Sequence, residues 1–208
     1  MADWSTIASV GTAAGTLVLA IATYASVRSA RRSALASERA LLAAIRPVLV
    51  SSRLEDPGEK VGFVDQHWVK VDGGRGIVEV TDEAIYLAIA LRNVGAGLAV
   101  LDRWDVHADR PRTEVSSTDD FRRLTRDIYV PAGDHGFWQG ALRDPDEAIF
   151  AEVRDAANEG RMVTIDLLYG DQEGGQRTVS RFTLMPMENG QPIAAVSRHW
   201  NLDRSDPR

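Results

Sequence analysis

The chain has 208 residues, of which 44% are hydrophobic and 26% are charged. This is the composition of a folded protein, and the length leaves room for one globular domain and an appendage. Because the chain contains no cysteine, disulfide scaffolds, thiolate zinc sites and cysteine nucleophiles are excluded. The net charge of −6 is uneven, because residues 1–46 carry +3 and residues 47–208 therefore carry −9; the main body lacks the basic face that a nucleic-acid partner requires.

Residues 7–27 form a stretch of 21 residues without a charged side chain. As an α-helix this stretch would be about 30 Å long, which matches the hydrocarbon thickness of a bilayer. Aromatic and basic side chains that suit the two membrane–water interfaces flank it: Trp4, Tyr24, Arg28, Arg31 and Arg32. We therefore predict a single transmembrane anchor, with the lipid bilayer as its partner.

Two other interpretations of this stretch remain open. A cleavable export signal needs a basic region ahead of its apolar core, whereas this chain begins Met-Ala-Asp-Trp and its arginines come after the core. A helix of a soluble fold needs a polar face, and four scattered hydroxyl residues supply only a weak one: Thr12, Thr16, Thr23 and Ser26. The anchor is the favoured interpretation.

The arginines also predict an orientation. Basic residues beside a span are retained on the cytoplasmic side, and all five arginines of the first 46 residues follow the span. We therefore expect a single-pass protein of the inner (cytoplasmic) membrane with its C-terminal domain in the cytoplasm. Gly11 and Gly15 form a G-x-x-x-G pattern, which favours close helix contact in membranes, so a homodimer through the anchor is a further hypothesis.

The chain is predicted to have three parts. Residues 1–27 are the transmembrane anchor, and residues 28–46 form a basic juxtamembrane helix that continues it, because good helix formers run up to Pro47. Residues 47–208 form an acidic, β-rich domain.

Beyond Pro47 the chain changes to short runs rich in β-branched and aromatic residues, separated by glycine-containing turns. Six such runs are evident, at residues 47–53, 76–81, 84–92, 98–107, 162–169 and 177–185. The run at 84–92 is expected to be covered on both faces, and the last two runs are expected to form a hairpin with its turn at 171–176. We predict a mainly β fold, in which the two predicted helices precede an antiparallel β-sandwich-like domain with one inserted α-helix.

The inserted helix is expected to follow residue 144. Asp144 is a suitable N-cap, Pro145 suits the first helical position, and Glu147 would complete a capping box. Gly160 is a suitable C-terminal stop. The expected apolar face consists of Ala148, Ile149, Val153 and Ala156.

The sequence contains no recognisable catalytic or metal-binding pattern. Its four histidines are scattered without ligand spacing, and it has no H-E-x-x-H, P-loop or G-x-S-x-G motif. Asp102 and Asp105 would lie on opposite faces of a regular strand, so they do not predict a paired-carboxylate catalyst. We therefore predict no catalytic residue, no cofactor and no metal site.

Two aromatic patches are candidate contacts with a protein partner. Phe137 and Trp138 lie between glycines in "HGFWQG", and Trp200 lies in "SRHWNLDR" near the C-terminus. Exposed aromatic side chains often anchor partners. The alternative is that these rings close the edge of the core and hold the terminus in place.

The chain resembles small bacterial single-pass membrane proteins of unknown function, in which an N-terminal helix carries a cytoplasmic β-rich domain. The resemblance depends on the uncharged span with its trailing arginines, on "LRNVGAG" at 91–97 and on "HWNLDR" at 199–204. It implies architecture and location, and it implies no activity.

The leading functional hypothesis is a membrane-anchored interaction module that presents its β domain to an unidentified protein partner at the cytoplasmic face. A membrane-tethered enzyme, with a site assembled from residues distant in sequence, is the alternative. A deep pocket with convergent polar groups would favour the enzyme, whereas an exposed aromatic patch or strand edge would favour the interaction module.

Overall fold

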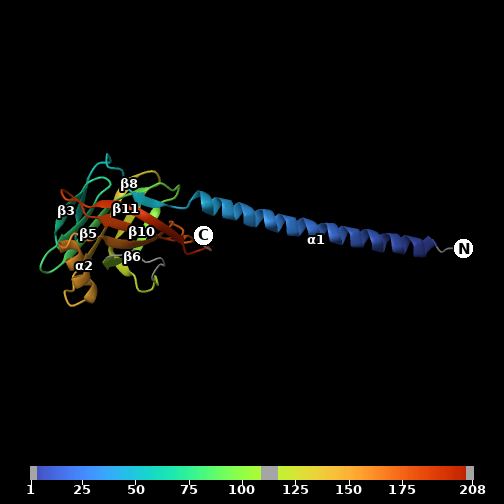
Figure 1. Ribbon diagram of the computed structural model, residues 1–208. Coiled ribbons are helices and arrows are strands. Elements are labelled where there is room, and N and C mark those ends of the chain that lie inside the picture. Colours follow the sequence, from blue (N-terminus) through green and yellow to red (C-terminus); the bar gives the residue numbers. More distant parts are fainter. Residues whose placement is uncertain (1–3, 109–116, 205–208) are drawn as a thin grey trace. The chain divides into compact units, whose positions relative to one another are not determined.

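The computed structural model describes residues 4–108 and 117–204, with side chains described from residue 11 onward. The chain divides into two units between Ala44 and Ile45. The first unit is helical and the second contains the strands, as Figure 1 shows. The predicted combination of an N-terminal helix with an antiparallel β domain and one inserted helix is confirmed.

The first unit is a single α-helix, α1 (Trp4–Ala44), of 41 residues. It covers residues 7–27 and runs on without a break to Ala44, two residues short of the predicted end of the basic helix at residue 46. The helix ends just before Pro47, because a proline ring disfavours helical geometry in the residue that precedes it. Within the described part of the chain, α1 is the one helix long and apolar enough to cross a membrane.

The second unit has eleven strands and one helix among its described residues. These are β1 (Leu49–Ser51), β2 (Glu59–Gly62), β3 (Trp68–Val71), β4 (Gly76–Val80), β5 (Ile85–Asn93), β6 (Ala99–Ala108), β7 (Arg122–Val130), β8 (His135–Leu142), α2 (Ala148–Asn158), β9 (Val163–Gly170), β10 (Arg177–Met185) and β11 (Ile193–Asn201).

Strand β5 is the centre of a four-stranded antiparallel sheet. It pairs with β8 along one edge and with β1 and β4 in succession along the other. One face of this sheet packs on the main core, to which Leu87 and Trp138 contribute. The other face is covered by the β2–β3 hairpin, where Val61, Phe63 and Tyr86 form a second core. The prediction that the 84–92 run is covered on both faces is therefore confirmed.

A five-stranded antiparallel sheet, in the order β11-β10-β9-β6-β7, closes the other side of the main core. The two sheets form a sandwich, and the rings of Trp104 on β6 and Trp138 on β8 meet edge to face across it at a centroid distance of 5.3 Å. The predicted hairpin is present, because β9 pairs with β10 in continuous register around the turn at 171–176.

The inserted helix begins later than the capping box predicts. Glu147 holds the N-cap position without a side-chain cap bond, and Asp144 instead accepts a hydrogen bond from the Asp146 N–H at 3.0 Å. The Glu147 carboxylate binds Arg122 on β7 at 2.5 Å, so a tertiary ion pair replaces the predicted local bond. Gly160 stops the helix as predicted, with a φ of 64° that favours glycine.

The buried face of α2 also differs from the expected one. Phe150, Val153 and Ala156 are buried in the main core. Ile149 is only partly buried, and Ala148 is exposed. Phe150 therefore contributes to the buried face of α2, which the sequence pattern assigned to Ala148 and Ile149.

The segment "LRNVGAG" is a structural junction. The fully buried Asn93 side chain accepts bonds from the Val48 and Gly95 N–H groups and donates to the Gly97 and Val130 carbonyls, at 2.7–3.1 Å. A Cβ on Gly97 would lie 1.7 Å from the Ile45 carbonyl oxygen. Glycine is required there because two backbone segments touch, which explains this part of the motif structurally.

Candidate functional site

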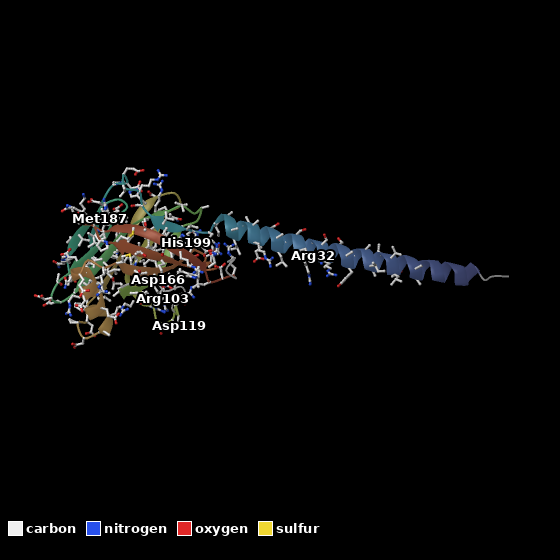
Figure 2. The ribbon with its side chains drawn as sticks, viewed as in Figure 1. Arg32, Arg103, Asp119, Asp166, Met187 and His199 are labelled. Carbon is white, nitrogen blue, oxygen red and sulfur yellow. The ribbon has the colours of Figure 1, made fainter. Side chains whose placement is uncertain are left out.

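The residues predicted to interact with a membrane all lie on α1. Trp4 is the first residue of the helix, and its side chain lies outside the described residues. Tyr24, Arg28, Arg31 and Arg32 are exposed, and Figure 2 labels Arg32 on the helix. Apart from the neighbouring residues and backbone of the helix itself, no described atom lies within 4 Å of a Cβ placed on Gly11 or Gly15, so the surface of small residues is open.

The residues of the two predicted aromatic patches lie on strands β8 and β11. Trp138 belongs to β8 and is fully buried in the main core, so the prediction that it contacts a partner is wrong. Trp200 belongs to β11 and is 8% exposed, with Arg181 and Arg198 stacked on its ring at 4.8 and 5.0 Å. Phe137 is half-buried beneath Arg126 at 5.6 Å. The burial of Trp138 and Trp200 favours the alternative, structural role for these two rings.

A buried ion pair lies on the outer face of the five-stranded sheet. Asp166 on β9 and Arg181 on β10 are directly opposite each other, and their side chains are 0% and 1% exposed. Arg181 donates from Nε to Oδ1 at 2.7 Å and from Nη2 to Oδ2 at 2.6 Å. This bidentate geometry is the strongest that the two groups form. Figure 2 labels Asp166 among the strands of the domain.

His107 extends this network toward the edge of the sheet. Its Nε2 lies 3.8 Å from Asp166 and 3.2 Å from Asp105. Burial would raise the pKa of Asp166, but the bonds from Arg181, and then the nearby His107 side chain, outweigh burial and hold its pKa below the ordinary value. The carboxylate is therefore ionised at neutral pH and compensated. The network lines none of the described pockets, and its evident role is structural.

A second polar chain begins at Ser180, the residue before Arg181 in β10. Ser180 Oγ lies 2.6 Å from His199 Nδ1 and 2.8 Å from Tyr169 Oη, which in turn accepts a bond from the Leu49 N–H at 3.1 Å. A serine beside a histidine is the start of a nucleophilic constellation. Ser180 is fully buried, however, and the chain of bonds attaches β1 to the sheet.

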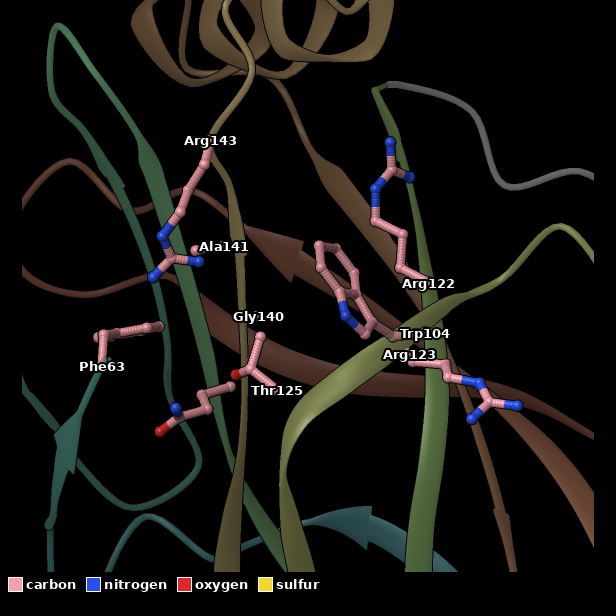
Figure 3. A pocket seen from close by; sticks show the side chains of 9 residues that line it. Phe63, Trp104, Arg122, Arg123, Thr125, Gly140, Ala141 and Arg143 are labelled. Atoms are coloured by element: carbon pink, nitrogen blue, oxygen red, sulfur yellow. The ribbon is translucent and has the colours of Figure 1, made fainter. Parts of the chain in front are cut away.

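A basic pocket lies where the two sheets separate at one side of the sandwich. β7 ends the five-stranded sheet and β8 ends the four-stranded one, and a cavity of about 220 Å³ opens between them. Figure 3 shows it with its lining side chains. The lining consists of Phe63, Trp104, Arg122, Arg123, Thr125, Gln139, Gly140, Ala141 and Arg143.

Carboxylates position two of the pocket's arginines. Arg122 contacts Glu147 at 2.5 Å and also stacks on the Trp104 ring at 5.7 Å. Arg143 donates to Asp65 at 3.2 Å. The Tyr86 hydroxyl donates to the same carboxylate at 2.7 Å. Burial would raise the pKa of Asp65, but the bonds from Tyr86, the His67 backbone and Arg143 hold it below the ordinary value.

Gln139 gives this pocket its unusual character. The residue is 3% exposed, and among the described residues its Oε1 has no hydrogen-bond partner. A buried polar atom without a partner costs about 1–3 kcal/mol and points to a missing water, ion or ligand. Sequence reasoning missed this pocket because its lining comes from four separate segments. The one local signal was the alternation of glycine with larger residues in "HGFWQGAL".

No group of three or more histidines, aspartates or glutamates in the described part of the chain is arranged to hold a metal ion. No protein-family model, no curated protein and no solved structure matches this chain. The site is therefore interpreted from its own geometry.

Proposed function

We propose that this is a single-pass inner-membrane protein in which α1 is the anchor and the β domain is a binding module in the cytoplasm. The observation that carries the proposal is the apolar surface of α1. Leu17, Val18, Leu19 and Ile21 are each between 61% and 69% exposed. So much continuous apolar surface is unfavourable in water and favourable in lipid.

The polar groups of this helix are compatible with lipid. The hydroxyls of Thr16 and Thr23 donate to the carbonyls of Thr12 and Leu19, each at 2.8 Å. Within a bilayer such bonds satisfy the hydroxyls without water. Thr16 and Thr23, which belong to the weak polar face of this helix, therefore do not oppose its insertion into a bilayer.

The β domain supports binding more than catalysis. The pocket between β7 and β8 is lined by arginine, aromatic and amide side chains, and its one hydroxyl, on Thr125, has no histidine or carboxylate beside it in the lining. Nucleophilic and acid–base catalysis both require such a pair. Among the described strands β8 pairs with β5 alone, so its other edge also offers backbone groups to a partner.

Membrane extraction and a topology reporter test the proposal. The full-length protein should sediment with membranes and resist carbonate extraction, and a reporter fused after Arg208 should be active only in its cytoplasmic form. Replacing Arg28, Arg31 and Arg32 with glutamine, with lysines added after Met1, should weaken or invert this orientation, because retained basic charge decides which end crosses.

Arginine-to-lysine replacements at the same three positions are the matched control, since they keep the charge and should leave the orientation unchanged. Recovery of most of the protein in the soluble fraction would refute the anchor. An active extracytoplasmic reporter on the wild-type chain would refute the location of the domain.

The open surface around Gly11 and Gly15 supports a homodimer through the anchor. Gly15→Leu should reduce crosslinking between full-length chains in membranes, because a large side chain separates the two backbones. Ala13→Leu, on the opposite side of the helix, is the control. Equal crosslinking of both variants would remove this element of the proposal.

A further inference from the structure

An exposed tryptophan lies on the β2–β3 hairpin. Trp68 on β3 is 67% exposed, whereas the other tryptophans with described side chains are at most 8% exposed. Val69 and Val71 of the same strand are buried in the second core, so strand alternation places Trp68 on the opposite, solvent-exposed face. A large exposed aromatic ring is a typical anchor for a protein partner.

The ring of Trp68 lies close to the backbone of β2. Gly62 pairs with Trp68, and a Cβ placed on Gly62 would lie 2.8–3.0 Å from three atoms of the ring. Glycine at this position therefore lets the ring extend across the hairpin. A ring that is already held in one position loses little conformational entropy when it contacts a partner.

The hydrogen bonds of the hairpin show which backbone groups of β3 face outward. The Phe63 N–H donates to the His67 carbonyl at 2.8 Å. Bonded and non-bonded pairs alternate in an antiparallel ladder, so the next pair, Gly62 and Trp68, is non-bonded, and the N–H and C=O of Trp68 point away from β2. Among the described strands, β3 (Figure 1) pairs with β2 alone, so these groups form an open strand edge.

Gln191 shows the same direction and marks one end of the open edge. Its Nε2 donates to the Lys70 carbonyl at 2.7 Å, and its Oε1 accepts a bond from the Asp72 N–H at 2.9 Å. This side-chain amide occupies the place that a neighbouring strand would take. The N–H and C=O of Trp68 and the N–H of Lys70 are left to form three backbone hydrogen bonds with an added strand.

Two lysines lie beside Trp68 on the same face of the hairpin. Lys60 on β2 and Lys70 on β3 are directly opposite each other, and like charges in this position are destabilising. Lys70 forms an ion pair with Asp72 at 2.7 Å, and a second carboxylate beside Lys70 would offset the repulsion further. A hollow of about 210 Å³, lined by Lys60, Trp68, Val69 and Lys70, leaves room for such a side chain.

We infer that the open edge of β3 binds an extended segment of a protein partner, which adds a third, antiparallel strand to the hairpin. The segment carries an apolar or aromatic residue opposite Trp68 and, two residues earlier, an acidic residue opposite Lys70. Both side chains then share the exposed face, because alternate residues of a strand face the same side. This inference deepens the proposed binding function of the β domain.

A protein segment suits this edge better than a membrane or a nucleic acid does. Outward backbone groups are satisfied by the backbone of an added strand, whereas lipid hydrocarbon offers them no partner. The charge of −9 on residues 47–208 opposes a polyanion. A single carboxylate, in contrast, needs only the two lysines beside Trp68.

The test uses full-length protein in detergent micelles, with its tryptophan indole nitrogens labelled for NMR, and Trp68→Phe identifies the Trp68 signal. The probe is the peptide acetyl-Thr-Glu-Val-Tyr-Thr-amide, whose tyrosine would lie opposite Trp68 and whose glutamate would lie opposite Lys70. It should shift the Trp68 signal saturably and slow the hydrogen exchange of the Trp68 and Lys70 amides. The same peptide with glutamine in place of glutamate should bind about two- to fivefold more weakly, which is the range of an exposed ion pair.

Two N-methylated peptides test the backbone bonds. In the antiparallel register the tyrosine N–H donates to the Trp68 carbonyl, whereas the valine N–H points to solvent. N-methylation of the tyrosine should therefore weaken binding about tenfold or more. N-methylation of the valine is the matched control and should change binding little.

Protein variants assign the side chains. Trp68→Ala should weaken binding about tenfold or more, measured by the exchange of the Lys70 amide. Lys70→Gln should remove the preference for the glutamate peptide over the glutamine peptide. Arg154→Gln, on the exposed side of α2, is the matched control and should keep this preference. Unchanged signals of the other tryptophans verify that each variant is folded.

The inference is overturned if the peptide does not shift the Trp68 signal saturably, or if methylation of the tyrosine weakens binding no more than methylation of the valine. Tighter binding of single-stranded oligo-dT than of the peptide would also overturn it, in favour of a nucleic acid. A shift of the Trp68 signal between zwitterionic and anionic nanodiscs would overturn it in favour of a membrane contact.

Because peptide binding is measured in micelles, its outcome is independent of topology. Peptide binding by a protein that cells keep soluble would refute only the anchor. A membrane-inserted protein whose β3 edge binds no peptide would refute only this inference.

Discussion

Removing Arg181 should be among the most destabilising single changes in the β domain. Arg181→Met keeps the length and apolar stem of the side chain but leaves the Asp166 carboxylate, which is 0% exposed, without its bidentate partner. Breaking one side of a buried ion pair costs about 3–5 kcal/mol, because the other charge stays buried without compensation. His107, at 3.8 Å, is too distant to replace two bonds of 2.6–2.7 Å.

The double variant Asp166→Leu/Arg181→Met provides the contrast. It removes both charges and fills the space with apolar atoms, so it should recover most of the lost free energy of unfolding. For a domain of this size, a loss of 3–5 kcal/mol corresponds to a decrease in Tm of about 6–20 °C. The double variant should lie within a few degrees of the wild type.

Tryptophan fluorescence during urea unfolding of the full-length protein in micelles measures this effect. Trp200 is a direct reporter, because Arg181 stacks on its ring at 4.8 Å. A loss below about 1 kcal/mol for Arg181→Met would show that the pair is solvated in solution. A double variant as unstable as the single one would show that packing, and not the unpaired charge, sets the cost.

Three further predictions concern stability. Gly97→Ala should lower the Tm by the equivalent of about 1–3 kcal/mol, because its Cβ would overlap the Ile45 carbonyl, whereas Gly175→Ala, which has open space, should not. Arg46→Ala should lower the free energy of unfolding in urea by about 1.5–3 kcal/mol, since Arg46 donates hydrogen bonds to Asn201 at 2.9 Å and to Asp203 at 2.5 Å. If the losses caused by Arg46→Ala and Asp203→Ala simply add in the double variant, this pairing is contradicted. The pKa values of Asp166 and Asp203 are lowered on folding. The stability that these carboxylates contribute is therefore present at neutral pH and should be lost as the pH falls below 3.8. Asp203→Asn should flatten this acid dependence of the unfolding free energy.

Local sequence patterns determined the elements whose signal lies within a single segment. The uncharged residues 7–27 and the helix formers after them predicted a helix that proved continuous from Trp4 to Ala44. The apolar residues at 84–92 predicted a strand buried on both faces, which is β5. The turn at 171–176 predicted the hairpin that β9 and β10 form. Each of these features depends on the spacing of neighbouring residues, which the chain itself displays.

Local sequence patterns did not predict the strands β8 and β11. No strand was predicted around Phe137 and Trp138, because isolated glycines weaken a strand pattern. In the fold these glycines make room for rings, as Gly140 does for Trp104. Trp200 likewise becomes a strand residue through its pairing with Val179. Such space is defined by a second segment, so no local pattern reveals it.

The polar sites depended wholly on tertiary structure. Asp166 meets Arg181 because the β9–β10 register sets them opposite each other, and a register shifted by one residue would turn both side chains to the other face. Arg122 on β7 and Gln139 on β8 line one pocket because the two strands end neighbouring sheets. Residue type and spacing along the chain specify which helices and strands form, whereas the packing of sheets decides which of their polar groups share a site.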